Sequence, residues 1–187
     1  GSAGGHLSLL AGLTSGHADW QAGFEGADTA VQGVLAMYPV VDLTNRHGIR
    51  QQASMDGFIS QKIIQQTREA APAVFEDGSP ISWIHREGVA EAAPPFCIVQ
   101  GTHDSLVWVE EVRRFVAELA PLTSVPLVYA ELTRAQHAFE IFHSPRTSHF
   151  LNAASAWLEW VRANHAQKTP ASENRCEVGF AADQRES

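Results

Sequence analysis

Apolar residues along the chain gather in short runs that are separated by longer polar or mixed stretches. Three of these runs have the length of β-strands, and they cover residues 31–38, 96–100 and 126–132. Uninterrupted apolar runs are typical of strands that are buried on both faces of a parallel sheet. We therefore predict three strands of one parallel sheet.

Apolar residues at helical spacing lie between and after these strands. Leu7–Leu13 is a compact, helix-compatible run, Val109–Leu119 carries its apolar residues on one face, and residues 150–161 carry a second apolar stripe. The order strand, connection, helix, strand predicts an α/β fold with right-handed crossovers. Because three strands form a narrow sheet, we expect the chain to be part of a larger one.

Two polar stretches interrupt this alternation. Residues 14–28 are rich in turn formers and predict a surface loop, whereas residues 44–70 are rich in amides and predict an excursion away from the sheet. Within the excursion, the apolar residues of 58–64 have helical spacing, which indicates an ordinary buried helix face or, as the alternative, part of a cap over a substrate. We place a catalytic domain at 1–166 and a polar, disordered tail at 167–187.

Composition narrows the function classes. The chain has 187 residues, 44% of them hydrophobic and 18% charged, with a net charge of −8 and no basic stripe, so we expect no nucleic-acid partner. No apolar stretch is long enough to span a membrane. The chain begins without Met, so any targeting segment or anchor upstream is not visible, and we expect a cytoplasmic location.

Cysteines and histidines suggest no metal chemistry. Cys97 lies in an apolar run and is expected to be a buried, inert thiol, whereas Cys176 lies in the polar tail. The nine histidines show no spacing of a metal site, so we predict no metal and no cofactor.

Three residues have the arrangement of a serine nucleophile with its base and acid. Ser2 is followed by Ala3 and two glycines and then by a helical run, which fits the sharp turn on which such a serine is carried. Asp104 follows the second predicted strand and His137 the third, 33 residues later, so both are expected at the carboxyl edge of the sheet. A serine hydroxyl needs a base that is itself oriented by a third group. We predict Ser2 as nucleophile, His137 as base and Asp104 as orienting acid.

A family resemblance rests on the same residues. Residues 2–7 (Ser-Ala-Gly-Gly-His-Leu), 101–107 (Gly-Thr-His-Asp-Ser-Leu-Val) and 136–139 (Gln-His-Ala-Phe) resemble three motif blocks of the hormone-sensitive-lipase-like bacterial carboxylesterases and lipases. These enzymes belong to the α/β-hydrolase superfamily, in which the triad order is Ser, Asp, His. Residues 75–80 resemble the segment before their acid-bearing strand, and the resemblance extends to about His165.

The resemblance implies a fold and a reaction. It implies the C-terminal portion of an α/β-hydrolase fold, with the N-terminal strands missing, and hydrolysis of a small ester or lipid through an acyl-enzyme. It implies the Ala3 N–H as one oxyanion donor, and a His-Gly-Gly-Gly loop, which the 187 residues do not contain, as the source of others. We therefore expect little activity from this chain alone. Trp108 and Phe139 are candidates for the substrate pocket, with core packing as the alternative.

Other interpretations stay open at this point. Ser2 and Asp104 also suit helix capping, His137 suits an ordinary surface histidine, and Gly1-Ser2 suits a cloning remnant. His103 is a less favoured base, since adjacent residues at a strand end point in different directions. A prolyl-oligopeptidase-type peptidase shares the triad order but usually has an aromatic residue where Ala3 stands. A non-catalytic hydrolase fragment is the third alternative, and the oligomeric state is not predicted.

Overall fold

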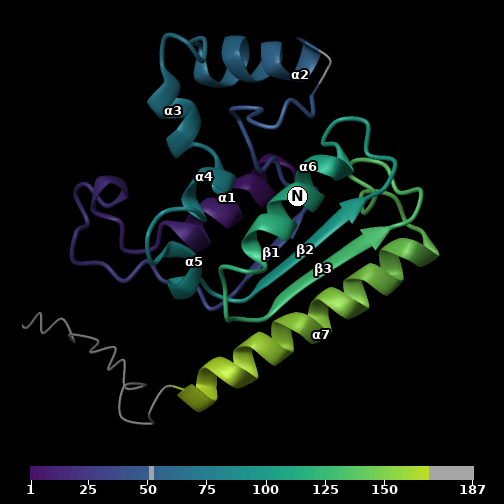
Figure 1. Ribbon diagram of the computed structural model, residues 1–187. Coiled ribbons are helices and arrows are strands. Elements are labelled where there is room, and N and C mark those ends of the chain that lie inside the picture. Colours follow the sequence, from purple (N-terminus) through teal and green to yellow (C-terminus); the bar gives the residue numbers. More distant parts are fainter. Residues whose placement is uncertain (51–52, 169–187) are drawn as a thin grey trace, which may run out of the picture.

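Three parallel strands form the centre of the protein (Figure 1). The computed structural model describes residues 1–50 and 53–168. The strands are β1 (Val34–Met37), β2 (Phe96–Gly101) and β3 (Leu127–Leu132), and their order in the sheet is β1-β2-β3. Val34 of β1 pairs with Phe96 of β2, which pairs with Leu127 of β3. The predicted parallel sheet is confirmed, although β1 is shorter than the apolar run that predicted it.

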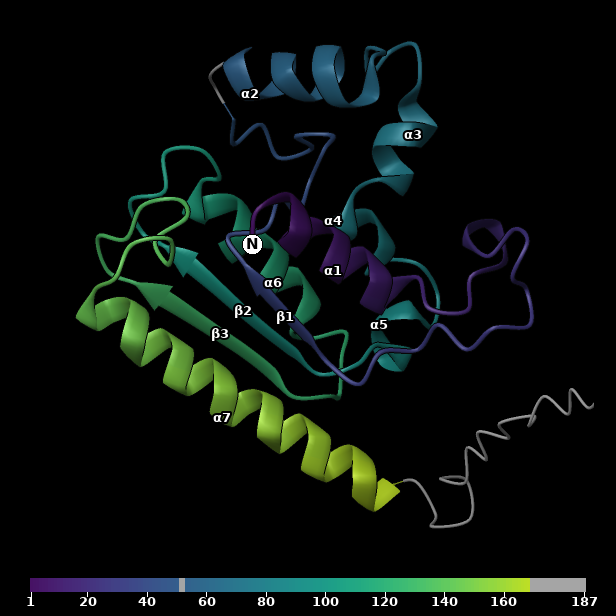
Figure 2. The same cartoon turned by 180° about the vertical axis from the view of Figure 1, so that it is seen from behind.

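Helices cover both faces of this sheet (Figures 1 and 2). One face carries α1 (Ala3–Leu13), α4 (Pro80–Trp83), α5 (Val89–Ala92) and α6 (Val109–Leu119), and the other carries α7 (Pro145–Lys168). Side chains alternate along a strand. Phe96 and Ile98 of β2 therefore face the α1–α6 side of the sheet, whereas Cys97 and Val99 face α7.

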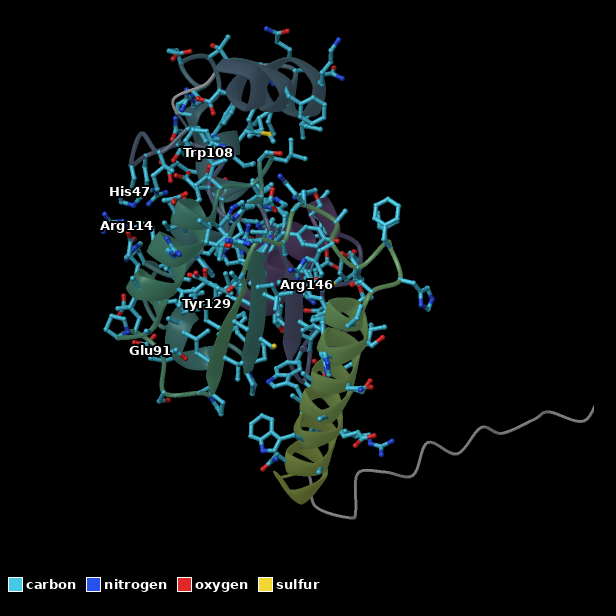
Figure 3. All side chains as sticks on the ribbon, turned by 90° about the vertical axis from the view of Figure 1, so that its right-hand side faces the viewer. His47, Glu91, Trp108, Arg114, Tyr129 and Arg146 are labelled. Atoms are coloured by element: carbon cyan, nitrogen blue, oxygen red, sulfur yellow. The ribbon has the colours of Figure 1, made fainter. Side chains whose placement is uncertain are left out.

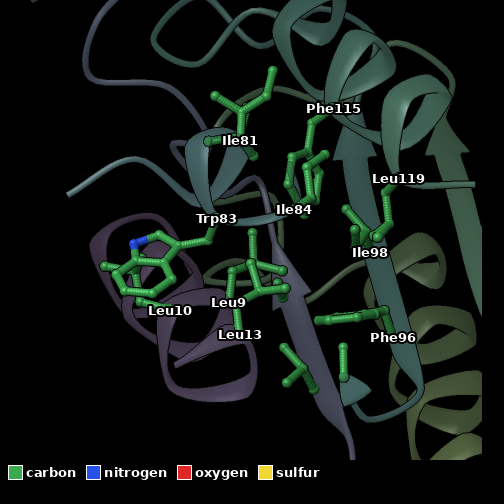
Figure 4. Close-up of a cluster of buried hydrophobic side chains, with 14 of the residues drawn as sticks. Leu9, Leu10, Leu13, Ile81, Trp83, Ile84, Phe96, Ile98, Phe115 and Leu119 are labelled. Carbon is green, nitrogen blue, oxygen red and sulfur yellow. The ribbon is translucent and has the colours of Figure 1, made fainter. Parts of the chain in front are cut away.

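The larger core lies between the sheet and the α1–α6 layer (Figure 4). Leu9 of α1, Trp83 of α4 and Phe115 of α6 belong to this core, and each is at most 1% exposed. The predicted amphipathic helix over Val109–Leu119 is confirmed to the residue. Because α1 and α6 are anchored in this core, the loops at the carboxyl ends of the strands are held in fixed positions.

Some elements differ from the sequence-based expectation. Among the three strands of the described residues, β2 alone is buried along its whole length. Strand β1 is half-buried on its α7 side, and β3 lies at an edge of the sheet and is partly exposed. The short helices α3 (Pro72–Asp77) and α4 each begin with a proline, whose ring suits the first helical position. Helix α7 extends through the predicted boundary at 166, and residues 169–187 of the predicted tail lie outside the described part.

The excursion between β1 and β2 folds above the carboxyl edge of the sheet (Figures 1 and 2). It contains α2 (Ala53–Phe58), which continues into the π-helical turn η2 (Ile59–Ile64), and then α3. The predicted surface loop over residues 14–28 contains one short 3-10 turn, η1 (Ala18–Trp20). The α2–η2 segment is the part of the excursion that reaches the candidate site.

Candidate active site

Ser2 lies on a strained turn directly before helix α1. Its φ of 52° and ψ of −122° are unusual for a residue with a side chain, and its N–H donates to the Met37 carbonyl at 3.0 Å. Three residues later, a Cβ on Gly5 would lie 2.9 Å from that same carbonyl oxygen. The turn is thus pressed against the end of β1, which explains the glycine at position 5.

Asp104 is buried in the loop after β2, with its carboxylate fully engaged. One oxygen, Oδ1, accepts from the N–H groups of Leu106 (2.9 Å) and Val107 (2.8 Å). The other, Oδ2, accepts from the Gln100 side-chain amide at 3.2 Å. These donors fix the plane of the carboxylate, so that Oδ2 is presented to the neighbouring imidazole.

His137 joins the other two predicted residues. Its Nδ1 lies 2.8 Å from Asp104 Oδ2, and its Nε2 lies 2.9 Å from Ser2 Oγ. Because an ionised carboxylate only accepts hydrogen bonds, the tautomer with the proton on Nδ1 suits this geometry and leaves Nε2 free to accept from the serine hydroxyl. His103 is exposed and bonds to Thr102 instead. The structure therefore brings Ser2, Asp104 and His137 together and leaves His103 out.

Ala3 is the first residue of α1, so no residue within that helix accepts from its N–H. It lies beside Ser2 in the wall of the cavity described next. This placement leaves a backbone donor next to the serine hydroxyl.

A cavity of about 530 Å³ adjoins Ser2. Its walls are mostly apolar and come from α1, from the loop after β1, from the α2–η2 segment and from the loop before α6. The lining residues are Ser2, Ala3, His6, Val40, Leu43, Arg50, Met55, Phe58, Ile59, Ile63, Ser105, Leu106, Val107 and Trp108. Trp108 lies on the side of the sheet that faces α2 (Figure 3).

Two sequence-based interpretations change at this cavity. Phe58 and Ile63 are 53% and 57% exposed and line the cavity, so the 58–64 segment is not the ordinary buried helix face that we favoured, although Ile59 is buried. Phe139 does not line the cavity. It packs in the second core cluster, edge-on to Tyr38 and Phe150, because the chain turns its ring towards α7.

Several residues of the site were not singled out from the sequence. Gln100 is fully buried and donates to Asp104, and a glutamine at the end of an apolar strand was the available signal. His6 donates from Nδ1 to the Val40 carbonyl at 2.8 Å, which ties α1 to the loop after β1. Burial lowers the pKa of His6, which favours the neutral ring.

A buried ion-pair network lies beside the cavity and joins α2 to α6. Arg50 Nε lies 2.7 Å from Asp56 of α2, and its Nη1 lies 2.8 Å from Glu111 of α6. Arg50 also donates to the Asp42 carbonyl, and Asp56 has a second cation in Arg68 at 3.0 Å. Burial raises the pKa of Glu111 to about 7, although the charge of Arg50 acts in the opposite direction.

Across residues 1–50 and 53–168, no group of three or more His, Cys, Asp or Glu side chains is placed to hold a metal ion. None of the helices in that part of the chain has the length and hydropathy needed to cross a membrane.

The family comparison matches the BD-FAE family model over residues 1–119. Among curated relatives, the probable carboxylic ester hydrolase LipM of Mycobacterium tuberculosis is 39% identical over 91% of this chain and 38% of its own length. Esterase LipC of the same organism is 36% identical over 89% of this chain and 40% of its own length. The chain thus spans about two fifths of the length of these relatives.

Solved structures show the same fold. The acetyl ester-xyloside bifunctional hydrolase of Caldicellulosiruptor lactoaceticus has a TM-score of 0.66 and 20% identity, with 86% of this chain and 54% of that chain covered. Esterase B of Lactobacillus rhamnosis has a TM-score of 0.65 and 19% identity over 92% of this chain and 54% of its own. At these identities the likeness shows the α/β-hydrolase fold alone. Because the family model matches more than half of its residues, the chain belongs to the BD-FAE family and has the α/β-hydrolase fold over the part that it covers.

Proposed function

We propose that this chain carries the catalytic residues of a carboxylic-ester hydrolase, with Ser2 as nucleophile, His137 as base and Asp104 as orienting acid. The observation that carries the proposal is the pair of hydrogen bonds that joins Ser2 Oγ to His137 Nε2 and His137 Nδ1 to Asp104 Oδ2. Curated relatives named as esterases support the same reaction class.

In the first half of the reaction, the Ser2 hydroxyl attacks the ester carbonyl carbon while its proton passes to His137 Nε2. The tetrahedral intermediate then collapses. The bond to the alcohol breaks, the alcohol leaves with the proton from Nε2, and the acyl group remains on Ser2. Asp104 stabilises the imidazolium that exists between the two proton transfers.

In the second half, water takes the place of the alcohol. It gives a proton to His137 Nε2 as it attacks the acyl carbon, and the carboxylic acid is released when that proton returns to Ser2 Oγ. The same imidazole therefore acts as base and then as acid in each half.

The negative charge of the tetrahedral oxygen needs preorganised donors. The Ala3 N–H, at the positive end of α1, supplies one in this proposal. Removal of one such donor typically lowers kcat by about 10²–10³-fold.

The acyl group is the part of the substrate that the cavity suits. Leu43, Met55, Phe58 and Ile63 give its walls an apolar character, and the volume of about 530 Å³ is in the range of small-molecule pockets. We therefore propose an ester with an apolar acyl chain. Arg50 also lines the cavity, where its charge is offset by the ion pairs with Asp56 and Glu111.

Turnover of p-nitrophenyl esters by the complete protein and its Ser2→Ala variant tests the proposal. We expect the variant to lose at least about 10³-fold in kcat, with a circular dichroism spectrum that matches the wild type. A peptide-amide substrate assayed in parallel separates esterase from peptidase activity. Equal ester turnover by the two proteins would show that Ser2 is not the nucleophile.

A further inference from the structure

The imidazole of His137 has a second neighbour besides Asp104. The ring of Tyr38, directly after β1, lies with its centroid 4.5 Å from that of the imidazole, and the two planes are tilted by 57°. Tyr38 is 3% exposed, and its hydroxyl donates to Glu140, three residues after His137. We propose that Tyr38 and Glu140 are positioning residues that hold the imidazole between Ser2 and Asp104. This inference rests on the proposed function.

The backbone around this contact is strained. Ser2, Tyr38 and Ala138 all have positive φ values, of 52°, 38° and 57°, and they come from three separate segments that meet at His137. Conformations of this kind are unfavourable for residues with a side chain and are retained where the surrounding structure holds them, often at functional sites. Tyr38 thus adopts an unfavourable backbone conformation where its ring reaches the imidazole.

Gly1 provides the space for the tyrosine. A Cβ at that position would lie 2.7 Å from the Tyr38 Cζ atom, so a larger residue would push the ring aside. The ring also makes an edge-on contact with Phe139, with the centroids 5.7 Å apart, and Phe139 is itself packed against Phe150 of α7. Tyr38 therefore contacts both the turn that carries the serine and the core beneath α7.

Glu140 completes the arrangement. One carboxylate oxygen accepts from the Tyr38 hydroxyl, and the other, Oε2, is buried without a hydrogen-bond partner among the described residues. Desolvation and the nearby carboxylates of Glu140 and Asp104 raise the pKa of Tyr38, so its hydroxyl keeps its proton and stays a donor. A buried carboxylate with one unused oxygen is costly. Control of the ring that contacts His137 gives this carboxylate a function.

The geometry also defines what the pair does during turnover. Asp104 holds the imidazole at Nδ1, but a single hydrogen bond still allows the ring to tilt through small changes about its Cα–Cβ and Cβ–Cγ bonds. The tilted ring contact with Tyr38 restricts this motion and keeps Nε2 directed at Ser2 Oγ. Because the pair does not line the substrate cavity, its loss is expected to affect kcat and to leave KM unchanged.

The test uses Tyr38→Phe and Glu140→Gln in the complete protein, with kcat expressed per site that a fluorophosphonate titrates. We expect each change to lower kcat between about two-fold and about ten-fold, the effect of one lost hydrogen bond, with KM unchanged. The acid limb of the pH profile of kcat should move as well. The groups that face the imidazole are Ser2 from the turn before α1, Asp104 from the loop after β2, and Tyr38 with its partner Glu140.

The chain offers a matched control. Tyr129, its other tyrosine, donates to Glu131 at 3.0 Å on the edge strand β3, so Tyr129→Phe and Glu131→Gln each remove a tyrosine–carboxylate hydrogen bond away from His137, the second together with the Arg113 ion pair. These controls should leave kcat and the pH profile unchanged. Wild-type kcat per titrated site and an unmoved profile in either Tyr38→Phe or Glu140→Gln would overturn the inference. Ser2→Ala, measured alongside, separates this failure from a failure of the proposed function, because only the latter would leave its turnover intact.

Discussion

The Glu111→Gln variant is predicted to become more stable relative to the wild type as the pH rises. Glu111 is 5% exposed, and its Oε1 has no hydrogen-bond partner in the described part of the chain, although Oε2 pairs with Arg50 at 2.8 Å. Removal of a carboxylate from water costs more than a single ion pair returns. This is why burial raises its pKa from an ordinary 4.5 to about 7, against the influence of Arg50.

The size of the effect follows from the linkage between protonation and folding. A carboxyl whose folded-state pKa is raised contributes stability that is complete below pH 4.5 and is lost as the pH rises through about 7. At about 1.4 kcal/mol per unit of pKa, the rise from 4.5 to about 7 corresponds to about 3 kcal/mol of unfolding free energy. Glutamine does not titrate. The difference in unfolding free energy, Glu111→Gln minus wild type, should therefore increase by about 3 kcal/mol between pH 4 and pH 8.

Urea denaturation of both proteins at one-unit intervals of pH measures this difference. Glu110→Gln is the matched control. Glu110 is the neighbouring residue on α6, but it is exposed and forms a surface ion pair with Arg113 at 3.8 Å. Its difference from wild type should vary by no more than about 0.5 kcal/mol. A flat or falling difference for Glu111→Gln would show that the Arg50 ion pair outweighs burial, and the reasoning would be wrong.

Three further predictions concern single positions. Gly101→Ala should lower the unfolding free energy by about 1–3 kcal/mol, because the new Cβ would lie 2.9 Å from the Ala135 carbonyl carbon. Gly4→Ala is the control and should preserve or raise the Tm, because open space surrounds position 4. Phe58→Ser should raise KM for a longer-chain ester more than for an acetate ester, with Tm unchanged, since the ring lines the cavity and is 53% exposed; equal increases would contradict its placement. Gln100→Leu should lower kcat about two- to ten-fold, because its amide supports the acid, and an unchanged kcat would show that the backbone donors suffice.

The sequence predicted the framework of the site because topology determines it. Asp104 and His137 follow neighbouring parallel strands, so their loops meet at one edge of the sheet, and the turn that carries Ser2 is fixed there by helix α1. The bounds of α6 could be predicted because its apolar residues repeat at helical spacing over its full length.

The rest depended on packing that no local pattern records. Tyr38 and Glu140 are 102 residues apart and meet only because α7 and the loop before it fold against β1. Phe139 follows Ala138, which has a positive φ, and its ring packs in the second core cluster; a sequence motif reveals neither. The apolar residues of the 58–64 segment have the same spacing on a buried helix as on one that lines a cavity.

Labelling with a fluorophosphonate, followed by peptide mass spectrometry on the complete protein, tests the central claim most directly. We predict one adduct, located on Ser2, and its loss in His137→Ala, because the serine then has no base at 2.9 Å. Ser8, an exposed serine that donates to the Gly4 carbonyl, is the internal comparison and should stay unmodified. An adduct on another serine, or none while ester turnover persists, would contradict the assignment of Ser2 as the nucleophile.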